Sequence, residues 1–361
     1  MTRWFDLIAD RKVIVCCGTG GVGKTTTAAS IAVTAAQAGR NAVVMTIDPA
    51  KRLADALGVN GLGNTPQIVD GPWPGTLAAV MLDTGETFDD VVRRNARDAA
   101  HAERVINNRF YRNVAGTLSG TQDYMAVEKL AELTESNQWD LVVVDTPPTR
   151  DALTFLDAPR VLSRLLDNPI YKLVTSNRGG VFQIANRAAQ TIVSQLGRVV
   201  GASVVDDAVT FFQSFEGMEQ GFRDRALATS ALLTQDATSF VLVASPRADT
   251  LDEARYFCEQ LTSNDLSPDA IVINRTLPRP GVDATRAATL QHQLNQTSLE
   301  SASIALSDLI RLSTDDRQRV QELAALAPEA LLLTVPLLAS DIHDVPGLID
   351  FASRVCEPAA D

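Results

Sequence analysis

Short apolar runs recur along the chain, and segments with helical spacing separate them. Several runs are apolar at every position, which is typical of parallel strands buried on both faces of a sheet. The runs lie at residues 13–17, 42–46, 77–82, 141–144, 240–244, 270–273 and 331–335. Their alternation with helices predicts an α/β fold with a doubly wound, mostly parallel sheet. Ligands of such sheets bind at the carboxyl ends of the strands, so the residues after each run are the candidates for chemistry.

Two stretches depart from this alternation. Residues 85–138 and 151–236 have almost no strand pattern and are rich in Ala, Leu, Arg and Glu. We predict that residues 1–361 form a single domain, in which both stretches are helical insertions that make a subdomain on the carboxyl edge of the sheet. Phe211, Phe215, Met218 and Phe222 recur at helical spacing in the second stretch. Such a stripe is more often part of a core than of a binding groove.

Charge and cysteine usage exclude several classes of protein. The formal net charge of −12 argues against a protein held to nucleic acid mainly by phosphate contacts. The N-terminus lacks the apolar core of a signal peptide, and the longest apolar stretches are too short to cross a bilayer. The four cysteines form neither a disulfide framework nor a C-x-x-C metal site. We therefore expect a cytoplasmic protein without a transmembrane segment.

The most informative motif directly follows the first apolar run. Residues 18–25 read Gly-Thr-Gly-Gly-Val-Gly-Lys-Thr, the phosphate-binding pattern G-x-x-x-x-G-K-T between a predicted strand and a predicted helix. The glycines allow a tight loop whose N–H groups surround phosphate oxygens, and the helix points its positive end at the same anion. Lys24 is expected to reach the β- and γ-phosphates, and the Thr25 hydroxyl is expected to bind Mg²⁺.

Acidic residues follow two other runs. Asp145 ends the apolar run 141–144, where a carboxylate can accept hydrogen bonds from the Mg²⁺ shell and from the phosphate-loop hydroxyl. Asp48 follows the run 42–46 and either holds Mg²⁺ through water, orients the attacking water, or simply forms a turn with Pro49. Asn274 follows the run 270–273 and suits either an adenine edge or a turn.

Together these motifs resemble the ATPases of arsenical pumps and of tail-anchored-protein targeting. The resemblance rests on residues 20–26, Asp48-Pro49-Ala50 with Leu53-Ala54-Asp55-Ala56-Leu57, Asp145-Thr146-Pro147-Pro148-Thr149 and Asn274, and it covers most of the chain. It implies a P-loop ATPase domain and a twofold dimer that encloses two ATP molecules. It also implies that Asp48 is a catalytic residue in a first switch loop, that Asp145 lies in a second, and that Asn274 lies at adenine. Segment 335–338, with Pro336, resembles the loop that closes over adenine.

The predicted site has three groups of residues. The nucleotide-binding residues are Gly18, Thr19, Gly20, Gly21, Val22, Gly23, Lys24, Thr25, Thr26, Asn274 and Pro336. Lys24, Asp48 and Asp145 are the predicted catalytic residues. Thr25 binds Mg²⁺, and Asp145 contacts the ion through water. The expected cofactors are ATP and Mg²⁺, without zinc.

This chain departs from the pattern of the family at Thr19. The family usually carries a second lysine there, which reaches the partner subunit's phosphates. The threonine implies that another cation substitutes, that a related chain supplies the lysine, or that turnover is slow. The family's C-x-x-C zinc pair is also missing, and the cysteines show no metalloid-binding cluster in the sequence.

The leading interpretation is an Mg²⁺-dependent ATPase that uses hydrolysis to close a dimer and rearrange its switch loops, coupled to a membrane-protein or pump partner. One alternative is a weakly hydrolysing subunit that regulates a lysine-bearing paralogue in a heterodimer. Another is an ATP-dependent metabolic enzyme. The partner is expected to be a second ATPase chain, identical or related, rather than a nucleic acid.

Overall fold

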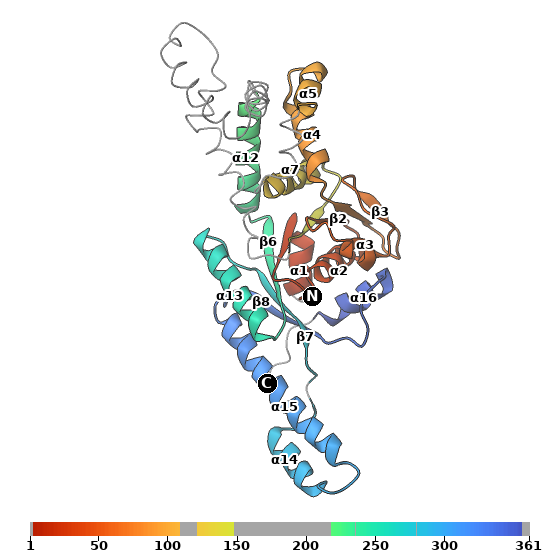
Figure 1. Ribbon diagram of the computed structural model, residues 1–361, viewed down its shortest axis with the longest axis vertical. Helices are drawn as coiled ribbons and strands as arrows, with labels where there is room; N and C mark the ends of the chain where they lie inside the picture. The colour runs from red at the N-terminus through yellow and green to blue at the C-terminus, as the bar shows by residue number, and fades with distance from the viewer. Residues whose placement is uncertain (1–2, 109–120, 148–217, 235, 279, 356–361) are drawn as a thin grey trace, which may run out of the picture. The chain divides into compact units, whose positions relative to one another are not determined.

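The computed structural model describes residues 3–108, 121–147, 218–234, 236–278 and 280–355 (Figure 1). The chain divides into two compact units. The sheet unit comprises Met1–Met81, Ser136–Leu153 and Asp236–Asp361, and the helical unit comprises Leu82–Glu135 and Thr154–Gln235. The helical subdomain expected at 85–138 and 151–236 stays a prediction, because much of the second stretch lies outside the described residues.

The sheet unit is built on an eight-stranded sheet in the order β3-β4-β2-β5-β1-β6-β7-β8. The strands are β1 (Val13–Cys17), β2 (Asn41–Thr46), β3 (Gln67–Val69), β4 (Thr76–Met81), β5 (Leu141–Asp145), β6 (Thr238–Ala244), β7 (Ala270–Thr276) and β8 (Leu331–Pro336). All neighbouring strands pair in parallel except β3 and β4, which are antiparallel. The predicted α/β fold with a mostly parallel sheet is therefore confirmed.

Each predicted apolar run is a strand, while β3 was not predicted. This strand has only three residues, and its Gln67 and Ile68 are exposed. It pairs on one side with β4 and forms the edge of the sheet. A strand that buries so little has no apolar run by which to recognise it.

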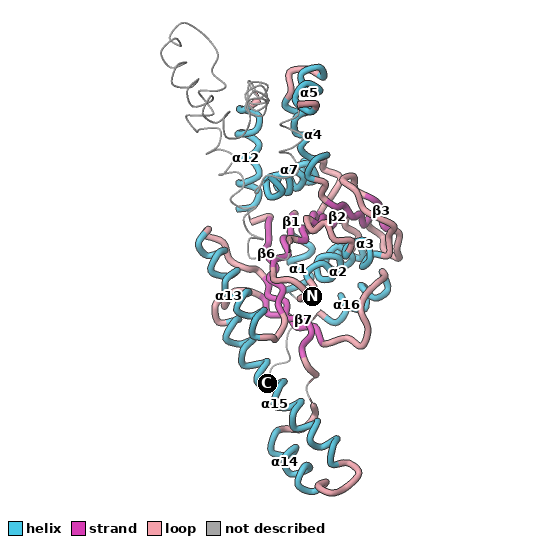
Figure 2. Tube along the Cα trace, viewed as in Figure 1, coloured by secondary structure: helices cyan, strands magenta, loops and turns pink. Residues whose placement is uncertain are grey.

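Helices cover both faces of the sheet (Figures 1 and 2). The helices of the sheet unit are α1 (Arg3–Asp10), α2 (Lys24–Gln37), α3 (Arg52–Leu57), α13 (Ala248–Ser263), α14 (Ala284–Gln293), α15 (Glu300–Ala324) and α16 (Val345–Arg354). Buried side chains of α1, α2, α3 and α16 form one core cluster with alternate residues of β1, β2, β5, β6 and β7. Helices α13 and α15 pack against β6 and β7, on the side opposite α2 and α16 in Figure 1.

The helical unit contains α4 (Thr84–Asn95), α5 (Ala99–Ile106), α7 (Thr121–Glu135) and α12 (Glu219–Thr234) among its described residues. Asp83 and Asp98 cap the first two helices by accepting hydrogen bonds from Glu86 N and His101 N. Helix α7 packs against α4 and α12. In the predicted apolar stripe, Met218 is buried, whereas Phe211, Phe215 and the side chain of Phe222 lie outside the described residues.

Candidate active site

The phosphate-binding pattern forms a loop between β1 and α2. Helix α2 begins at Lys24, and Gly23, at its N-cap, has a left-handed φ of 96°. Gly18 and Gly21 also have positive φ values, of 145° and 77°. Strand β1 pairs with β5 on one side and β6 on the other, and the chain order reverses at this point of the sheet. The loop therefore lies at the carboxyl end of the strand where a doubly wound sheet binds its ligand.

Two neighbouring strands leave no room for side chains at the ends of this loop. A Cβ atom on Gly18 would lie 2.1 Å from the Val243 carbonyl oxygen of β6. A Cβ atom on Gly23 would lie 2.3 Å from Nδ2 of Asn274, on β7. The loop backbone is thus packed directly against the ends of β6 and β7, which explains the glycines at both positions.

Lys24 is a cation buried at the start of α2. Lys24 is only 6% exposed, and its Nζ donates to the Thr19 carbonyl oxygen over 2.9 Å. Burial lowers the pKa of Lys24 from 10.5, and the charge of Arg52 acts in the same direction, while Asp145 and Asp48 oppose it. A buried ammonium group with one backbone acceptor is well suited to bind an anion, because phosphate oxygens can replace its lost hydration.

Strand register brings two hydroxyl groups to the Asp145 carboxylate. Thr46 on β2 pairs directly with Asp145 on β5. Oδ2 of Asp145 accepts hydrogen bonds from Thr25 Oγ1, at 2.8 Å, and from Thr46 Oγ1, at 3.0 Å. The other oxygen, Oδ1, is buried and has no hydrogen-bond partner within the described part of the chain. Burial raises the pKa of Asp145 from 3.8 to about 6.

These groups fit a magnesium ion. An unpartnered carboxylate oxygen beside a threonine hydroxyl offers the hard oxygen donors that Mg²⁺ prefers. Thr25 and Asp145 are the residues that would hold the ion, as the sequence predicts. The positive charge would also offset the desolvation that raises the pKa of Asp145.

Asp48 lies just beyond β2 and connects to the same network. Its N–H donates to Thr46 Oγ1 over 3.2 Å, and its Oδ1 accepts from Ala50 N over 3.0 Å. The second bond is the local turn that the sequence left open as an alternative. Through Thr46, however, the turn is linked to Asp145, so Asp48 belongs to the site and also shapes its own loop.

Asn274 is buried against the phosphate loop. Its Nδ2 donates to the Val22 carbonyl oxygen over 2.8 Å, and its Oδ1 accepts from Arg275 N over 2.8 Å. Asn274 therefore ties β7 to the loop that precedes Lys24. Its predicted contact with adenine stays a prediction, and the structure adds a positioning role that sequence reasoning missed.

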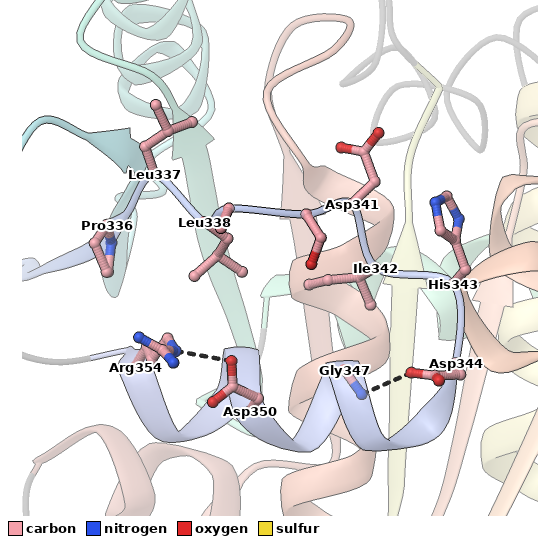
Figure 3. A pocket seen from close by; sticks show the side chains of 12 residues that line it. Pro336, Leu337, Leu338, Asp341, Ile342, His343, Asp344, Gly347, Asp350 and Arg354 are labelled. Carbon is pink, nitrogen blue, oxygen red and sulfur yellow. Dashed lines mark hydrogen bonds and ion pairs between the residues drawn. The ribbon is translucent and has the colours of Figure 1, made fainter.

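Pro336 ends β8 and lines a pocket of about 580 Å³ (Figure 3). Residues 336–344 run along one side of this pocket, and Gly347, Asp350 and Arg354 of α16 line the other. Within the pocket wall, Arg354 Nε donates to Asp350 Oδ2 over 2.8 Å. The segment 335–338, predicted to close over adenine, thus borders a cavity large enough for a ligand, and its role there stays a prediction.

Two threonines of the site were missed by sequence reasoning. Thr46 bridges Asp48 and Asp145, and Thr146 donates through Oγ1 to the Cys16 carbonyl oxygen over 2.8 Å. Both are buried at the ends of neighbouring strands. The available signal was their place at a strand end beside a predicted site carboxylate, since such positions must satisfy buried polar groups.

The cysteines offer no reactive centre in the described part of the chain. Cys16, Cys17 and Cys258 are free and buried. Burial raises the pKa of Cys17 to about 12, so its thiol stays protonated at neutral pH. No group of three or more His, Cys, Asp or Glu side chains that could hold a metal ion is found among the described residues. Likewise, none of the helices described is long and apolar enough to span a membrane.

Comparison with known proteins identifies the family of this site. A family profile described as "Anion-transporting ATPase" matches residues 11–310, which include the phosphate loop, Asp48, Asp145 and Asn274. The chain belongs to the anion-transporting ATPase family. It is 29% identical to "ATPase GET3" of Malassezia globosa over 281 residues, 75% of this chain and 74% of that protein. It is 27% identical to "ATPase get3" of Aspergillus terreus over 267 residues, 73% of each chain.

The anion-transporting ATPase family and these relatives establish this chain as a nucleotide-binding ATPase. Use of a nucleotide and Mg²⁺ follows in general from that activity. The predicted family is thereby confirmed from residues that the sequence alone had singled out.

Replacing Gly18 with alanine should destabilise this ATPase by about 2–4 kcal/mol, because the new Cβ meets the β6 backbone and the residue keeps a positive φ. Gly21→Ala is the matched control. Its φ is also positive, but no atom lies within 4 Å of the added Cβ, so we expect a loss of only about 1 kcal/mol. Urea unfolding of both variants checks the difference, and equal losses would contradict the close packing of the loop against β6.

Asp145→Asn should stabilise the nucleotide-free ATPase at pH 8. Because the folded-state pKa is raised to about 6, the folded chain binds the proton more tightly than the unfolded chain does. Stability therefore falls as pH rises from about 4 to 6 and stays lower above that range. Removing the charge should recover about 1–3 kcal/mol at pH 8 and nothing below about pH 4.

Thermal unfolding of this variant at both pH values, without nucleotide or Mg²⁺, measures the effect. Asp55→Asn, an exposed carboxylate on α3, provides the control and should show no such pH-dependent gain. An Asp145→Asn chain that is less stable than the wild type at pH 8 would contradict the desolvated, ionised carboxylate described above.

Proposed function

We propose that this chain hydrolyses ATP with Mg²⁺ in order to change its own conformation and that of a bound partner. In this proposal Lys24 binds the β- and γ-phosphates, and the backbone of residues 18–23 surrounds them. Asp48 orients the attacking water, while Thr25 and Asp145 hold the magnesium ion. When bound, the ion supplies positive charge to the phosphate oxygens.

One observation carries the proposal: Lys24, Thr25 and Asp145 converge at the carboxyl end of β1. Thr25 donates to Asp145 over 2.8 Å, and the opposite charges of Lys24 and Asp145 attract each other. The site needs little rearrangement to receive a phosphate and a divalent cation. Such preorganisation favours phosphoryl transfer, in which positioning and charge supply most of the catalysis.

Hydrogen bonds couple the position of the γ-phosphate to the two loops that follow β2 and β5. Asp48 and Asp145 are linked through Thr46, so an ion or phosphate that displaces Asp145 also shifts the hydrogen bonds of Asp48. Loss of the γ-phosphate would release both loops, as in other switch ATPases. We therefore propose that hydrolysis changes the conformation of residues 46–52 and of Thr146 and Pro147.

Hydrogen exchange in the ATP-bound and ADP-bound states tests this switch. Amides of residues 46–52 should exchange more slowly with a non-hydrolysable ATP analogue and Mg²⁺ than with ADP and Mg²⁺. Amides inside α15, far along the chain from the loops, serve as the internal control and should not change. Identical exchange of residues 46–52 in the two states would contradict a nucleotide-driven switch.

We further propose that two chains cooperate and that a membrane protein or pump is the partner, on the basis of the family resemblance. The second candidate is a slowly hydrolysing subunit paired with a related chain that carries lysine at the position of Thr19. Thr19 favours that candidate because its side chain is neutral and its carbonyl group is bound by Lys24. An ATP-dependent metabolic enzyme would instead show turnover that depends on a small-molecule acceptor.

Purification from native cells distinguishes these assemblies. Native mass spectrometry should find either two identical chains or this chain with one related ATPase. Recovery of identical chains alone would contradict the heterodimer. Recovery of monomers alone, with ATP bound, would contradict both forms of cooperation.

A further inference from the structure

A pair of exposed cations follows the Asp48 turn. Lys51 is the N-cap residue of α3 and Arg52 is the first residue of the helix, and both are exposed. Nη1 of Arg52 lies 3.5 Å from Oδ2 of Asp48, which is the oxygen that the turn with Ala50 leaves available. The Arg52 side chain is 58% exposed, whereas that of Asp48 is only 14% exposed. A nearly buried carboxylate of the site is thus paired with a guanidinium group that remains in contact with solvent.

In this ion pair, Arg52 can exchange the Asp48 carboxylate for a phosphate. A contact of 3.5 Å whose arginine side chain is largely in solvent contributes little and costs little to break. A guanidinium group binds phosphate oxygens in a bidentate way that is stronger than a single contact with a carboxylate at that distance. The Arg52 side chain can therefore leave Asp48 when negative charge builds up on a transferring phosphoryl group.

The partner of Arg52 is connected to the phosphate loop by hydrogen bonds. Asp48 N donates to Thr46 Oγ1, and Thr46 Oγ1 donates to the Asp145 carboxylate. Thr25, next to Lys24, donates to the same carboxylate, so a phosphoryl group bound by Lys24 would lie on the side of the site that Asp48 faces. Phosphoryl transfer gathers charge on three equatorial oxygens, and Thr19 offers no side-chain cation to meet it.

We infer that Arg52 is a second cation, besides Lys24, that binds the γ-phosphoryl group in the transition state, and that it moves there from Asp48 within the same chain. The inference rests on the proposed hydrolysis of ATP. Transfer of Arg52 also releases Oδ2 of Asp48, which then accepts a hydrogen bond from the attacking water. The ion pair with Asp48 is thus the resting position of a catalytic arginine.

The chemical step balances without any further reactant. The water oxygen forms a bond to Pγ, and the bond between Pγ and the β–γ bridging oxygen breaks, its electron pair leaving with ADP. One proton of the water stays on the phosphate product, and the other passes by way of Asp48 to solvent. Arg52 and Lys24 stay protonated throughout and only offset the charge.

Steady-state hydrolysis by Arg52→Ala tests the inference, with Lys51→Ala as the matched control. Arg52→Ala should lower kcat about 100- to 1000-fold while the KM for ATP changes less than about threefold, because the interaction is made only in the transition state. Arg52→Lys should recover part of kcat, since it keeps the charge but loses the bidentate geometry. Lys51→Ala should stay within about twofold of the wild type on both constants.

A second measurement does not depend on turnover. ADP with aluminium fluoride, which resembles the transferring phosphoryl group, should bind the wild type more tightly than ADP alone does. Arg52→Ala should lose this gain and bind ADP normally, a pattern that a folding defect does not produce. An unchanged kcat in Arg52→Ala, or an equal loss of kcat in Lys51→Ala, would overturn the inference. If the wild type still hydrolysed ATP, the proposed function would remain supported. A wild-type chain that binds ATP without hydrolysing it would overturn both.

Discussion

Lys24→Ala should weaken ATP binding by about 100-fold or more and abolish hydrolysis, the largest effect expected from any single change in this chain. Lys24 is the cation buried at the phosphate loop, where its Nζ donates to the Thr19 carbonyl oxygen. Removing it leaves the bound phosphates without a compensating charge in a partly desolvated site. Titration calorimetry with ATP and Mg²⁺ measures the affinity.

The same variant should keep its fold. A buried ammonium group destabilises the fold when the site is empty, as its lowered pKa indicates. Its loss should therefore leave the melting temperature unchanged or slightly raised. Lys51→Ala, an exposed lysine nearby in the sequence, is the control for affinity. Unaltered ATP affinity in a folded Lys24→Ala chain would show that the phosphates bind elsewhere.

Asp48→Asn should lower kcat by about 100- to 10,000-fold with little change in ATP affinity. The amide oxygen can still accept from Ala50 N, so the turn is preserved. The amide has no negative charge with which to orient the water or to hold Arg52, and only the chemical step should suffer. Single-turnover hydrolysis with saturating enzyme isolates that step from product release.

Asp55→Asn is the matched control for this second effect. Asp55 is an exposed carboxylate on α3, and its loss should leave the single-turnover rate unchanged. If Asp48→Asn hydrolysed ATP as fast as the wild type, Asp48 would be only the turn residue that its contact with Ala50 suggests. The comparison thus decides whether Asp48 takes part in hydrolysis or only forms the turn.

The sheet could be predicted because its central strands are buried on both faces. Runs such as 141–144 are apolar throughout, and buried parallel strands have no polar face to interrupt them. The edge strand β3 has little buried surface, so its sequence contains no apolar run. The phosphate loop could be predicted because its chemistry requires particular residue types at fixed spacing within one short segment of the sequence.

Contacts between strands account for what sequence reasoning missed. Thr46 meets Asp145 only because β2 and β5 are neighbours in register, although the two residues are far apart in the chain. Asn274 reaches the Val22 carbonyl oxygen for the same reason, across the end of β7. The position of Arg52 beside Asp48 depends on the tight turn at Ala50, which fixes the start of α3. Such pairings are set by topology and turn geometry, neither of which a single motif specifies.

The most direct test of the proposed ATPase cycle is the rate of Mg²⁺-dependent ATP hydrolysis per chain, followed over a wide range of protein concentrations. We expect turnover that disappears when Mg²⁺ is chelated and that rises with concentration to a plateau, as two chains come together. Bound ATP that is released unhydrolysed at every concentration would contradict it.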